Sequence, residues 1–403
     1  MPKDKMSFQA TAGTAGLFVV AAALRLLLFT AFPGLPNLLT GRVEISTPVT
    51  SFKRCTCRRV CSLYNHNVSP YDGGVYHQAP LLLPLFSLLP DPSTYPIFAY
   101  ILYTLVDLLS ANALYKIAES GEGGASRLYS SPRKEKRWSG YVVAALFLFN
   151  PFTIATCIGR PTSVFTTCAI LHAVAKALSG NIFTSMLSLS FAAYLSMYPL
   201  LLLPPMVILA YDRTYNPKAP KSLAQLAGMC TLALTLTDLT PNAGLWGYSP
   251  SPRCSTASVR SSFGFFWLHP ISSYTPALTI RLRQQPLAVI TLLLGIFAIF
   301  KPYPSIADTS LFLSLVPCFR HVFPLLRYSF VTASVVLYGT FLGPAFYHLW
   351  IYAGSGNANF FYAITLVWSL GLSLLVSDLA FAVLRDEWEV ERPEMRGKEI
   401  RQI

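Results

Sequence analysis

Residues 348–366 read His-Leu-Trp-Ile-Tyr-Ala-Gly-Ser-Gly-Asn-Ala-Asn-Phe-Phe-Tyr-Ala-Ile-Thr-Leu, and they join two strongly apolar runs at 323–350 and 360–384. Each run is long enough for a helix that crosses about 30 Å of hydrocarbon. The connection between them, residues 354–359, is polar and broken by glycine. Polar, non-helical backbone persists at membrane depth only against protein, a water-filled cavity or a bound ligand. The stretch therefore predicts two membrane helices whose connection is the best candidate for a working site.

Composition extends this prediction to the whole chain of 403 residues. Hydrophobic residues make up 53% of it and charged residues 12%, against about 25% charged residues in a typical soluble domain. The mean hydropathy is +0.48, so a soluble core could not hide the apolar surface. The sequence predicts a single all-α polytopic membrane domain over residues 1–403.

The number of membrane spans follows from the apolar runs. The first run, 15–32, has no small-residue cleavage site after it and is expected to be the first span rather than a signal peptide. Residues 80–90 fit either a re-entrant segment or an extra span. The count is about ten to twelve transmembrane helices. The candidate spans are 15–32, 95–117, 141–157, 162–178, 182–210, 223–239, 263–280, 286–300, 305–318, 323–350 and 360–384.

Basic residues in short loops predict the orientation, because they favour the cytosolic side. The segment 119–139 follows the second span and is expected to be a cytosolic basic loop. By alternation, the loop 34–78 faces the lumen, and the tail 385–403 is cytosolic if the span count is even. The net charge of +13 is thus mainly orienting, and nucleic acid is not an expected partner, since no basic stripe alternates with aromatic residues. The basic residues of the loop are Arg127, Arg133, Lys134, Lys136 and Arg137.

Two short segments, 53–63 and 247–262, depart from this pattern. The first places basic residues on the predicted luminal side, together with Cys55, Cys57 and Cys61, and the second is a Ser- and Pro-rich interruption. A metal cluster, luminal disulfides and translation out of frame at residues 54–62 and 247–262 are three interpretations. The spacing lacks the second half of a zinc site, so neither a metal nor a cofactor is predicted.

Nucleophilic chemistry has one candidate pair, Cys168 and His172, which share a helix face four residues apart. Both lie in an apolar run that disfavours a thiolate, and no acid or amide nearby in the sequence would orient the histidine. We interpret both as packing residues and predict no catalytic residue.

A second polar cluster lies in the loop 34–78, where residues 69–74 read Ser-Pro-Tyr-Asp-Gly-Gly. Proline and glycine in this order favour a compact turn. The turn would hold Tyr71, Asp72, Tyr76 and His77 at the membrane surface, where they suit a sugar or phosphate headgroup. The alternative is that Tyr64, Tyr71 and Tyr76 form an ordinary interfacial aromatic belt.

Several stretches resemble one family, the class U subunit of GPI transamidase. The similarity runs from about residue 41 to 390 and is interrupted at 55–62 and 247–262. The last of the motifs is the most specific. They are Ser69-Pro-Tyr-Asp-Gly-Gly-Val-Tyr-His-Gln-Ala-Pro, Asn150-Pro-Phe-Thr-Ile, Asp238-Leu-Thr-Pro-Asn, Phe300-Lys-Pro-Tyr-Pro-Ser-Ile-Ala-Asp and Leu349-Trp-Ile-Tyr-Ala-Gly-Ser-Gly-Asn-Ala-Asn-Phe-Phe-Tyr-Ala-Ile-Thr-Leu.

The resemblance implies a non-catalytic, multi-pass subunit in the endoplasmic-reticulum membrane, with a fold similar to the large lipid-linked glycosyltransferases (GT-C). Its implied partners are the other GPI transamidase subunits, including a separate cysteine-protease-like catalytic chain, and its implied ligand is the GPI lipid. Asn357 and Asn359 would hydrogen-bond phosphate or sugar oxygens, although they could equally serve the backbone of a broken helix. Phe360, Phe361 and Tyr362 would pack on lipid or ring faces, and Tyr71, Asp72 and His77 would contribute the other wall.

Two other functions stay open at this point. A mannosyltransferase of GPI biosynthesis that uses dolichol-phosphate mannose would need paired carboxylates, but Glu44, Asp72 and Asp91 are far apart in the sequence. A secondary transporter would use buried acids such as Asp107 or Asp238. Asp107 and Asp378 could instead be hydrogen-bonding partners between helices.

Overall fold

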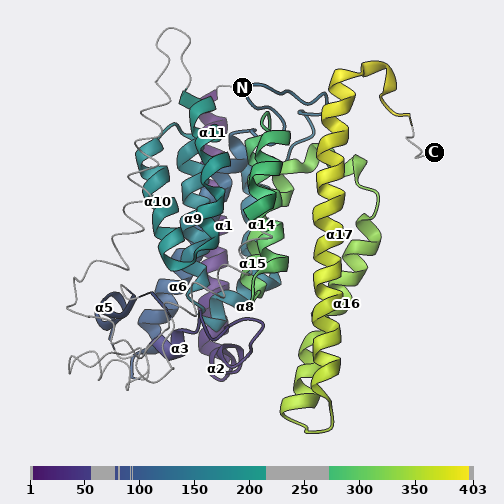
Figure 1. Ribbon diagram of the computed structural model, residues 1–403. Coiled ribbons are helices and arrows are strands. Elements are labelled where there is room, and N and C mark those ends of the chain that lie inside the picture. Colours follow the sequence, from purple (N-terminus) through teal and green to yellow (C-terminus); the bar gives the residue numbers. More distant parts are fainter. Residues whose placement is uncertain are drawn as a thin grey trace, which may run out of the picture.

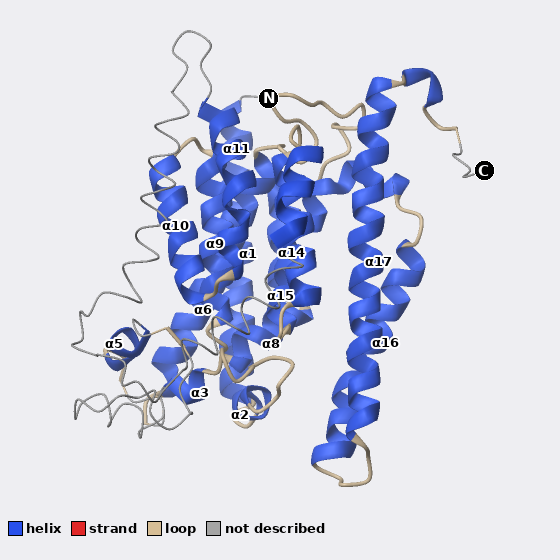
Figure 2. Cartoon of the chain, viewed as in Figure 1, coloured by secondary structure: helices blue, strands red, loops and turns tan. Residues whose placement is uncertain are grey.

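The computed structural model describes residues 3–55, 78–79, 82–90, 92, 94–214 and 272–398. Within these ranges the regular elements are helices joined by loops and turns, and β-structure is limited to isolated bridges between Ser51 and Pro161 and between Ala125 and Ser130 (Figure 2). The loop residues Tyr71, Asp72, Tyr76 and His77, Asp238, the cysteines Cys57 and Cys61 and the whole segment 247–262 lie outside the described residues.

The helices stand roughly side by side as a bundle, with one long hairpin along its edge (Figure 1). From residue 3 to residue 214 the described elements are α1 Lys3–Ala31, α2 Leu35–Thr40, α3 Phe52–Cys55, α5 Leu82–Ser87, α6 Pro96–Glu119, α7 Gly140–Leu148, α8 Pro151–Gly159, α9 Ser163–Leu178, α10 Ile182–Leu195, η1 Tyr198–Leu202 and α11 Leu203–Thr214. After a helical stretch at 272–281 come α14 Pro286–Phe300, α15 Ile306–Leu315, η2 Val316–Leu325, α16 Ser329–Ile351, α17 Ala358–Glu391 and η3 Pro393–Met395.

Among the described residues, five helical segments are long and apolar enough to cross a membrane, or six if the bent pair α7 and α8 counts as one span. Shorter apolar helices, α9, α10 and α14, stand beside them. The expected count of ten to twelve is a finer statement and stays a prediction, because the run 223–239 and the first half of the run 263–280 lie outside the described residues.

The apolar run 141–157 is bent rather than straight. The two helices α7 and α8 meet at 53°, where Pro151 cannot donate a backbone hydrogen bond. Asn150 caps the second helix, since its side-chain oxygen accepts from the Phe152 N–H at 2.9 Å. The Asn-Pro pair therefore ends one helix and starts the next.

The prediction of one span over 182–210 is wrong. The chain forms α10, turns through η1 and returns as α11, so that a Cβ built on Gly180 would lie 3.7 Å from the Thr214 Cγ2 atom. Residues before α10 and at the end of α11 are thus neighbours, which requires two antiparallel segments. Pro199 at the start of η1 favours the break, because proline interrupts a continuous helix.

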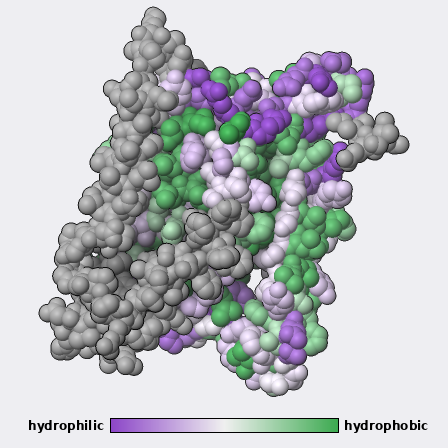
Figure 3. Space-filling view, viewed as in Figure 1, coloured by the Kyte–Doolittle hydropathy of each residue, from purple (hydrophilic) through white to green (hydrophobic). Residues whose placement is uncertain are grey.

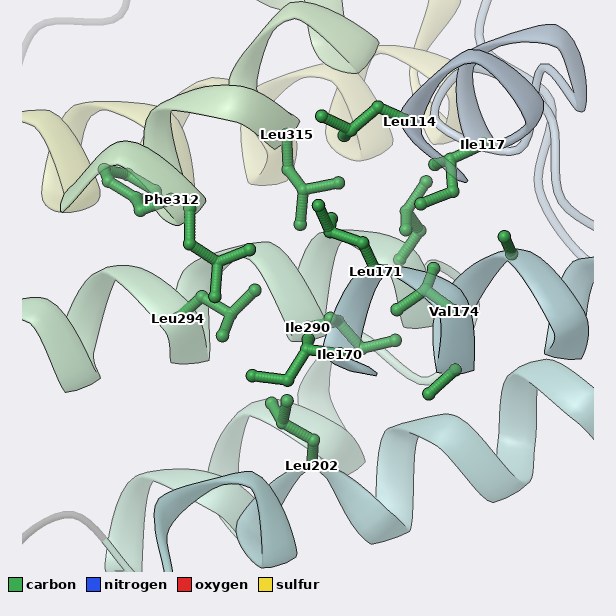
Figure 4. Close-up of a cluster of buried hydrophobic side chains, with 14 of the residues drawn as sticks. Leu114, Ile117, Ile170, Leu171, Val174, Leu202, Ile290, Leu294, Phe312 and Leu315 are labelled. Atoms are coloured by element: carbon green, nitrogen blue, oxygen red, sulfur yellow. The ribbon is translucent and has the colours of Figure 1, made fainter. Parts of the chain in front are cut away.

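The core of the bundle is apolar and continuous. Side chains from α6, α9, α14 and α15 interdigitate with Leu202 of η1 (Figure 4). Leu171, Phe312 and Ile290 are fully buried there. Packing of this kind holds each helix at a fixed distance from the next.

One ion pair is embedded in this bundle. Arg25 of α1 donates from Nε to the Asp107 carboxylate of α6 at 2.9 Å, and both side chains are buried. Asp107 thus joins two helices, as the sequence predicted for one of its two possible roles.

The long hairpin of α16 and α17 forms as the apolar runs predicted. The two helices approach closely at Gly339 and Gly371, since a Cβ added to either glycine would lie only 3.0 Å from the nearest side-chain atom of the partner helix. Asp378 of α17 accepts hydrogen bonds from the backbone N–H groups of Arg327 and Tyr328 at 2.9–3.1 Å. The predicted helix-pairing role of Asp378 is therefore confirmed, and it serves the start of α16.

The two ends of the molecule differ in polarity. At the upper end in Figure 1, which we call the basic-loop end, residues 120–139 contact the C-terminal part of α17: Arg133 pairs with Asp386 at 2.6 Å and also with Glu389. Hydrophilic side chains gather at this end in Figure 3. The opposite end, the hairpin-tip end, holds α2 and the turn 352–357. The assignment of these ends to cytosol and lumen stays a prediction.

Candidate functional site

The polar connection predicted from the sequence forms the tip of the hairpin. Gly354 adopts φ +64°, a left-handed conformation that favours glycine. The N–H groups of Ser355 and Gly356 donate to the Leu349 carbonyl at 3.2 and 2.9 Å and close the end of α16. Backbone groups of the tip therefore hydrogen-bond to one another, which leaves the side chains of the tip available for other contacts.

Asn357 and Asn359 are both exposed at this tip. Asn357 caps α17, because its side-chain oxygen accepts from the Asn359 N–H at 3.1 Å. The Asn357 amide nitrogen and the whole Asn359 amide make no hydrogen bond to any described residue. The Asn357 side-chain oxygen thus serves the helix. The Asn357 amide nitrogen and the oxygen and nitrogen of the Asn359 amide have no partner within the described part of the chain.

The aromatic residues of the tip divide into two roles. Phe361 packs within the hairpin, 5.4 Å from the Tyr347 ring and 6.1 Å from the Trp350 ring. By contrast, Phe360 and Tyr362 are 56% and 64% exposed. Phe361 therefore stiffens the tip, whereas Phe360 and Tyr362 present apolar faces outward.

Arg42 joins this tip to the bundle, and no pattern in the sequence had singled it out. It lies in the turn after α2, and its guanidinium is 4.7 Å from the Tyr347 ring centre and 5.7 Å from that of Tyr352. Cation–π contacts of this geometry are favourable. No carboxylate of a described residue pairs with Arg42, so its positive charge remains available beside the tip.

Glu44, two residues further on, was considered from the sequence only as one of three widely spaced acids and not as part of this site. Both of its carboxylate oxygens are shielded from solvent and have no hydrogen-bond partner among the described residues. Burial raises the pKa of this carboxyl, and its own backbone N–H and Arg42 offset only part of that effect. A shielded carboxyl that receives no hydrogen bond from another described residue is costly, and a ligand hydroxyl or amine would supply one.

The remaining predicted site residues cannot be placed with these. Tyr71, Asp72 and His77 lie outside the described residues. Cys168 packs against an apolar cluster of α6, α8 and neighbouring elements, which agrees with a packing role. In the described ranges, no group of three His, Cys, Asp or Glu side chains could hold a metal ion.

These observations define a class: a polytopic, all-helical membrane protein with an exposed tip that combines amides, aromatic faces and one cation. The family model described as GPI transamidase subunit PIG-U matches residues 19–237 and 226–368. The chain belongs to this family, which confirms the resemblance seen in its motifs.

Characterised relatives span nearly the whole chain. The GPI-anchor transamidase component PIGU of Homo sapiens is 31% identical over 424 aligned residues, covering 92% of this chain and 94% of its own length. The GPI transamidase component GAB1 of Saccharomyces cerevisiae is 31% identical, covering 93% and 96%. A GAB1 homolog of Schizosaccharomyces pombe is 30% identical, covering 91% and 92%. None of these matches bears the name of a mannosyltransferase.

Proposed function

We propose that this chain is a non-catalytic subunit of a GPI transamidase complex in the endoplasmic-reticulum membrane, where it binds the GPI lipid and presents it for attachment to the C-terminus of precursor proteins. Membership of the PIG-U family supports the complex. The observation that carries lipid binding is the hairpin tip, with unpartnered amides on Asn357 and Asn359 beside the Arg42 guanidinium.

The chemistry of the tip fits a glycolipid headgroup that carries phosphate. Amide N–H groups donate to phosphate or sugar oxygens, and Arg42 supplies the charge that a phosphate requires. Glu44 would accept from a sugar hydroxyl or a primary amine. Phe360 and Tyr362 would cover a ring face or the first part of an acyl chain.

Three further residues complete this proposal. Tyr71, Asp72 and His77 of the loop 34–78 would form the wall opposite the hairpin tip. Their turn motif, residues 69–74, would hold them at the membrane surface.

We further propose that the chemistry of transfer belongs to a separate, cysteine-protease-like subunit. Two acids buried in the bundle support a binding role, because Asp107 is committed to Arg25 and Asp378 to the start of α16. The proposed fold of the full chain is a bundle of ten to twelve transmembrane helices similar to that of the GT-C glycosyltransferases, used here for holding a lipid.

The test replaces both amides and follows GPI attachment in cells that lack the endogenous subunit. Asn357→Ala combined with Asn359→Ala removes hydrogen bonds of about 1 kcal/mol each, which predicts roughly thirtyfold weaker retention of GPI. Asn181→Ala is the matched control, since Asn181 is an exposed residue before α10 whose side chain makes no cap.

The readouts are a GPI-anchored reporter at the cell surface and co-precipitation of the other subunits. We expect the double variant to lose the reporter and keep the subunits. Loss of the subunits together with the reporter would mean that the tip serves assembly, and full reporter levels would refute the binding role.

A further inference from the structure

A groove lies at the other end of the molecule, where nothing described so far assigns a ligand. It forms between the bend of α7 and α8 on one side and α15 and η2 on the other, with a volume of about 570 Å³. That volume falls within the range of small-molecule sites. Its walls are mainly apolar and include Tyr141, Ala145, Leu146, Leu313 and Pro317.

The groove follows α7 from its start to the bend. Its lining residues on α7 run from Tyr141 to Phe147, six positions or about 9 Å along the helix, and continue through the bend to Pro151. The hydrocarbon of a bilayer is about 30 Å thick. The groove therefore starts at the basic-loop end, where α7 begins, and covers only part of that thickness.

A positive charge within an aromatic frame lies close in the chain to the groove residues Tyr141 and Pro317. Arg320 of η2 lies 5.4 Å from the Trp138 ring centre and 5.3 Å from that of Phe323. Trp138 precedes the groove residue Tyr141 by three positions, and Arg320 follows Pro317 by three. Trp and Tyr favour the membrane–water interface, and we therefore expect the Arg320 guanidinium at headgroup level.

The charge of Arg320 is not neutralised within the described part of the chain. None of the ion pairs there involves Arg320, whose described contacts are the two aromatic rings. Lys136 and Arg137, just before Trp138, are exposed and add to the positive charge of this face. An anionic group would meet favourable charge here, and a neutral one would leave Arg320 unpaired.

We propose that this groove binds one anionic phospholipid of the leaflet at the basic-loop end, with an acyl chain between α7 and α15 and its phosphate on Arg320. The site is separate from the hairpin tip, which lies at the opposite end of the bundle. Lipid bound there would brace the bent pair of α7 and α8 from outside.

The unpaired charge of Arg320 near an apolar groove favours a phospholipid as the occupant, because one phospholipid molecule carries both an acyl chain and an anionic phosphate. Contact with a partner subunit is an outcome that the test must be able to report.

The test measures lipids retained by the intact purified complex, reconstituted in nanodiscs of phosphatidylcholine with or without phosphatidylserine and analysed by native mass spectrometry. Arg320→Gln should lower retained phosphatidylserine about fivefold, the effect of roughly 1 kcal/mol for one basic residue near an anionic lipid. Arg392→Gln is the matched control, because Arg392 also stacks on a tryptophan, Trp388, at the same end but away from the groove.

A second pair of variants fills the groove. Ala145→Phe, within the groove, should expel the retained lipid, whereas Ala193→Phe, equally half-buried on α10, should not. Equal retention in Arg320→Gln and Arg392→Gln, or in the two phenylalanine variants, would overturn the proposal. So would cross-linking of a Leu146→Cys variant to a partner subunit in place of lipid. GPI retention should be unchanged by Arg320→Gln, which separates this site from the proposed function.

Discussion

Replacing Asp107 by leucine is expected to destabilise the helical bundle by about 3–5 kcal/mol, the usual cost of removing one partner from a buried ion pair. Arg25 is 0% exposed and lies six residues before the end of α1, about 9 Å along the helix. It donates to the Asp107 carboxylate at 2.9 Å and to the carbonyl oxygens of Ala21 and Leu148 at 3.2 and 3.0 Å. Without Asp107, two carbonyl groups remain, and these do not neutralise the guanidinium charge.

The double variant Arg25→Met with Asp107→Leu separates charge from packing. Replacing a whole buried ion pair by apolar residues is often close to neutral. Here the Leu148 carbonyl, at the α7–α8 bend, also loses its donor, which costs about 1–3 kcal/mol. We therefore expect the double variant to be more stable than Asp107→Leu alone and somewhat less stable than the parent.

The assay heats the detergent-solubilised complex and measures the fraction that remains monodisperse by fluorescence-detected size-exclusion chromatography. The expected order of midpoint temperatures is parent, double variant, then Asp107→Leu. A single variant as stable as the parent would refute the reasoning. A double variant less stable than the single would show that the pair acts through something other than an uncompensated charge.

Two further predictions concern other groups in the fold. Asp378→Ala leaves the N–H groups of Arg327 and Tyr328 without their acceptor and should cost about 1–3 kcal/mol in the same heating assay; an Asp378→Asn variant, which keeps one oxygen, should lose less, and equal losses would contradict the capping role. Burial raises the pKa of Glu122 from 4.5 to about 7, and the ion pair with Arg213 offsets part of this increase. Because the folded-state pKa is the higher one, this group's contribution is fully present below about pH 4.5 and is lost as pH rises through about 7, a change of up to roughly 3 kcal/mol. Glu122→Gln should flatten the midpoint temperature across that window, whereas Glu135→Gln, at an exposed position, should leave its slope unchanged.

The sequence predicts best those elements whose signals are local. The runs at 95–117, 162–178, 286–300 and 360–384 coincide with α6, α9, α14 and α17, because each is a continuous apolar stretch with polar or proline-containing flanks. The run 182–210 was wrongly predicted to be one span, because the turn at η1 is itself apolar and hydropathy does not fall where the chain reverses. Pro199 was the available signal.

Only part of the candidate site could be predicted from the sequence, for a related reason. Asn357 and Asn359 stood out because amides and glycines interrupt two apolar runs. Arg42 and Glu44 did not, since their meaning lies in contacts with Tyr347 and with the start of α15, some 260 to 300 positions away in the chain. A single sequence contains no record of such long-range neighbours, and an arginine in a loop is by default interpreted as an orienting charge.

The central claim is that the hairpin tip holds the GPI lipid, and the amount of GPI that copurifies with the intact complex tests it most directly. Mass spectrometry of the lipid extract would compare the parent with Arg42→Gln, with Asn357→Ala combined with Asn359→Ala, and with the control Asn181→Ala. We predict that the double variant retains roughly thirtyfold less GPI per complex, that Arg42→Gln also retains less, and that the control matches the parent. Equal GPI in all four complexes, with the same complement of subunits, would contradict the account.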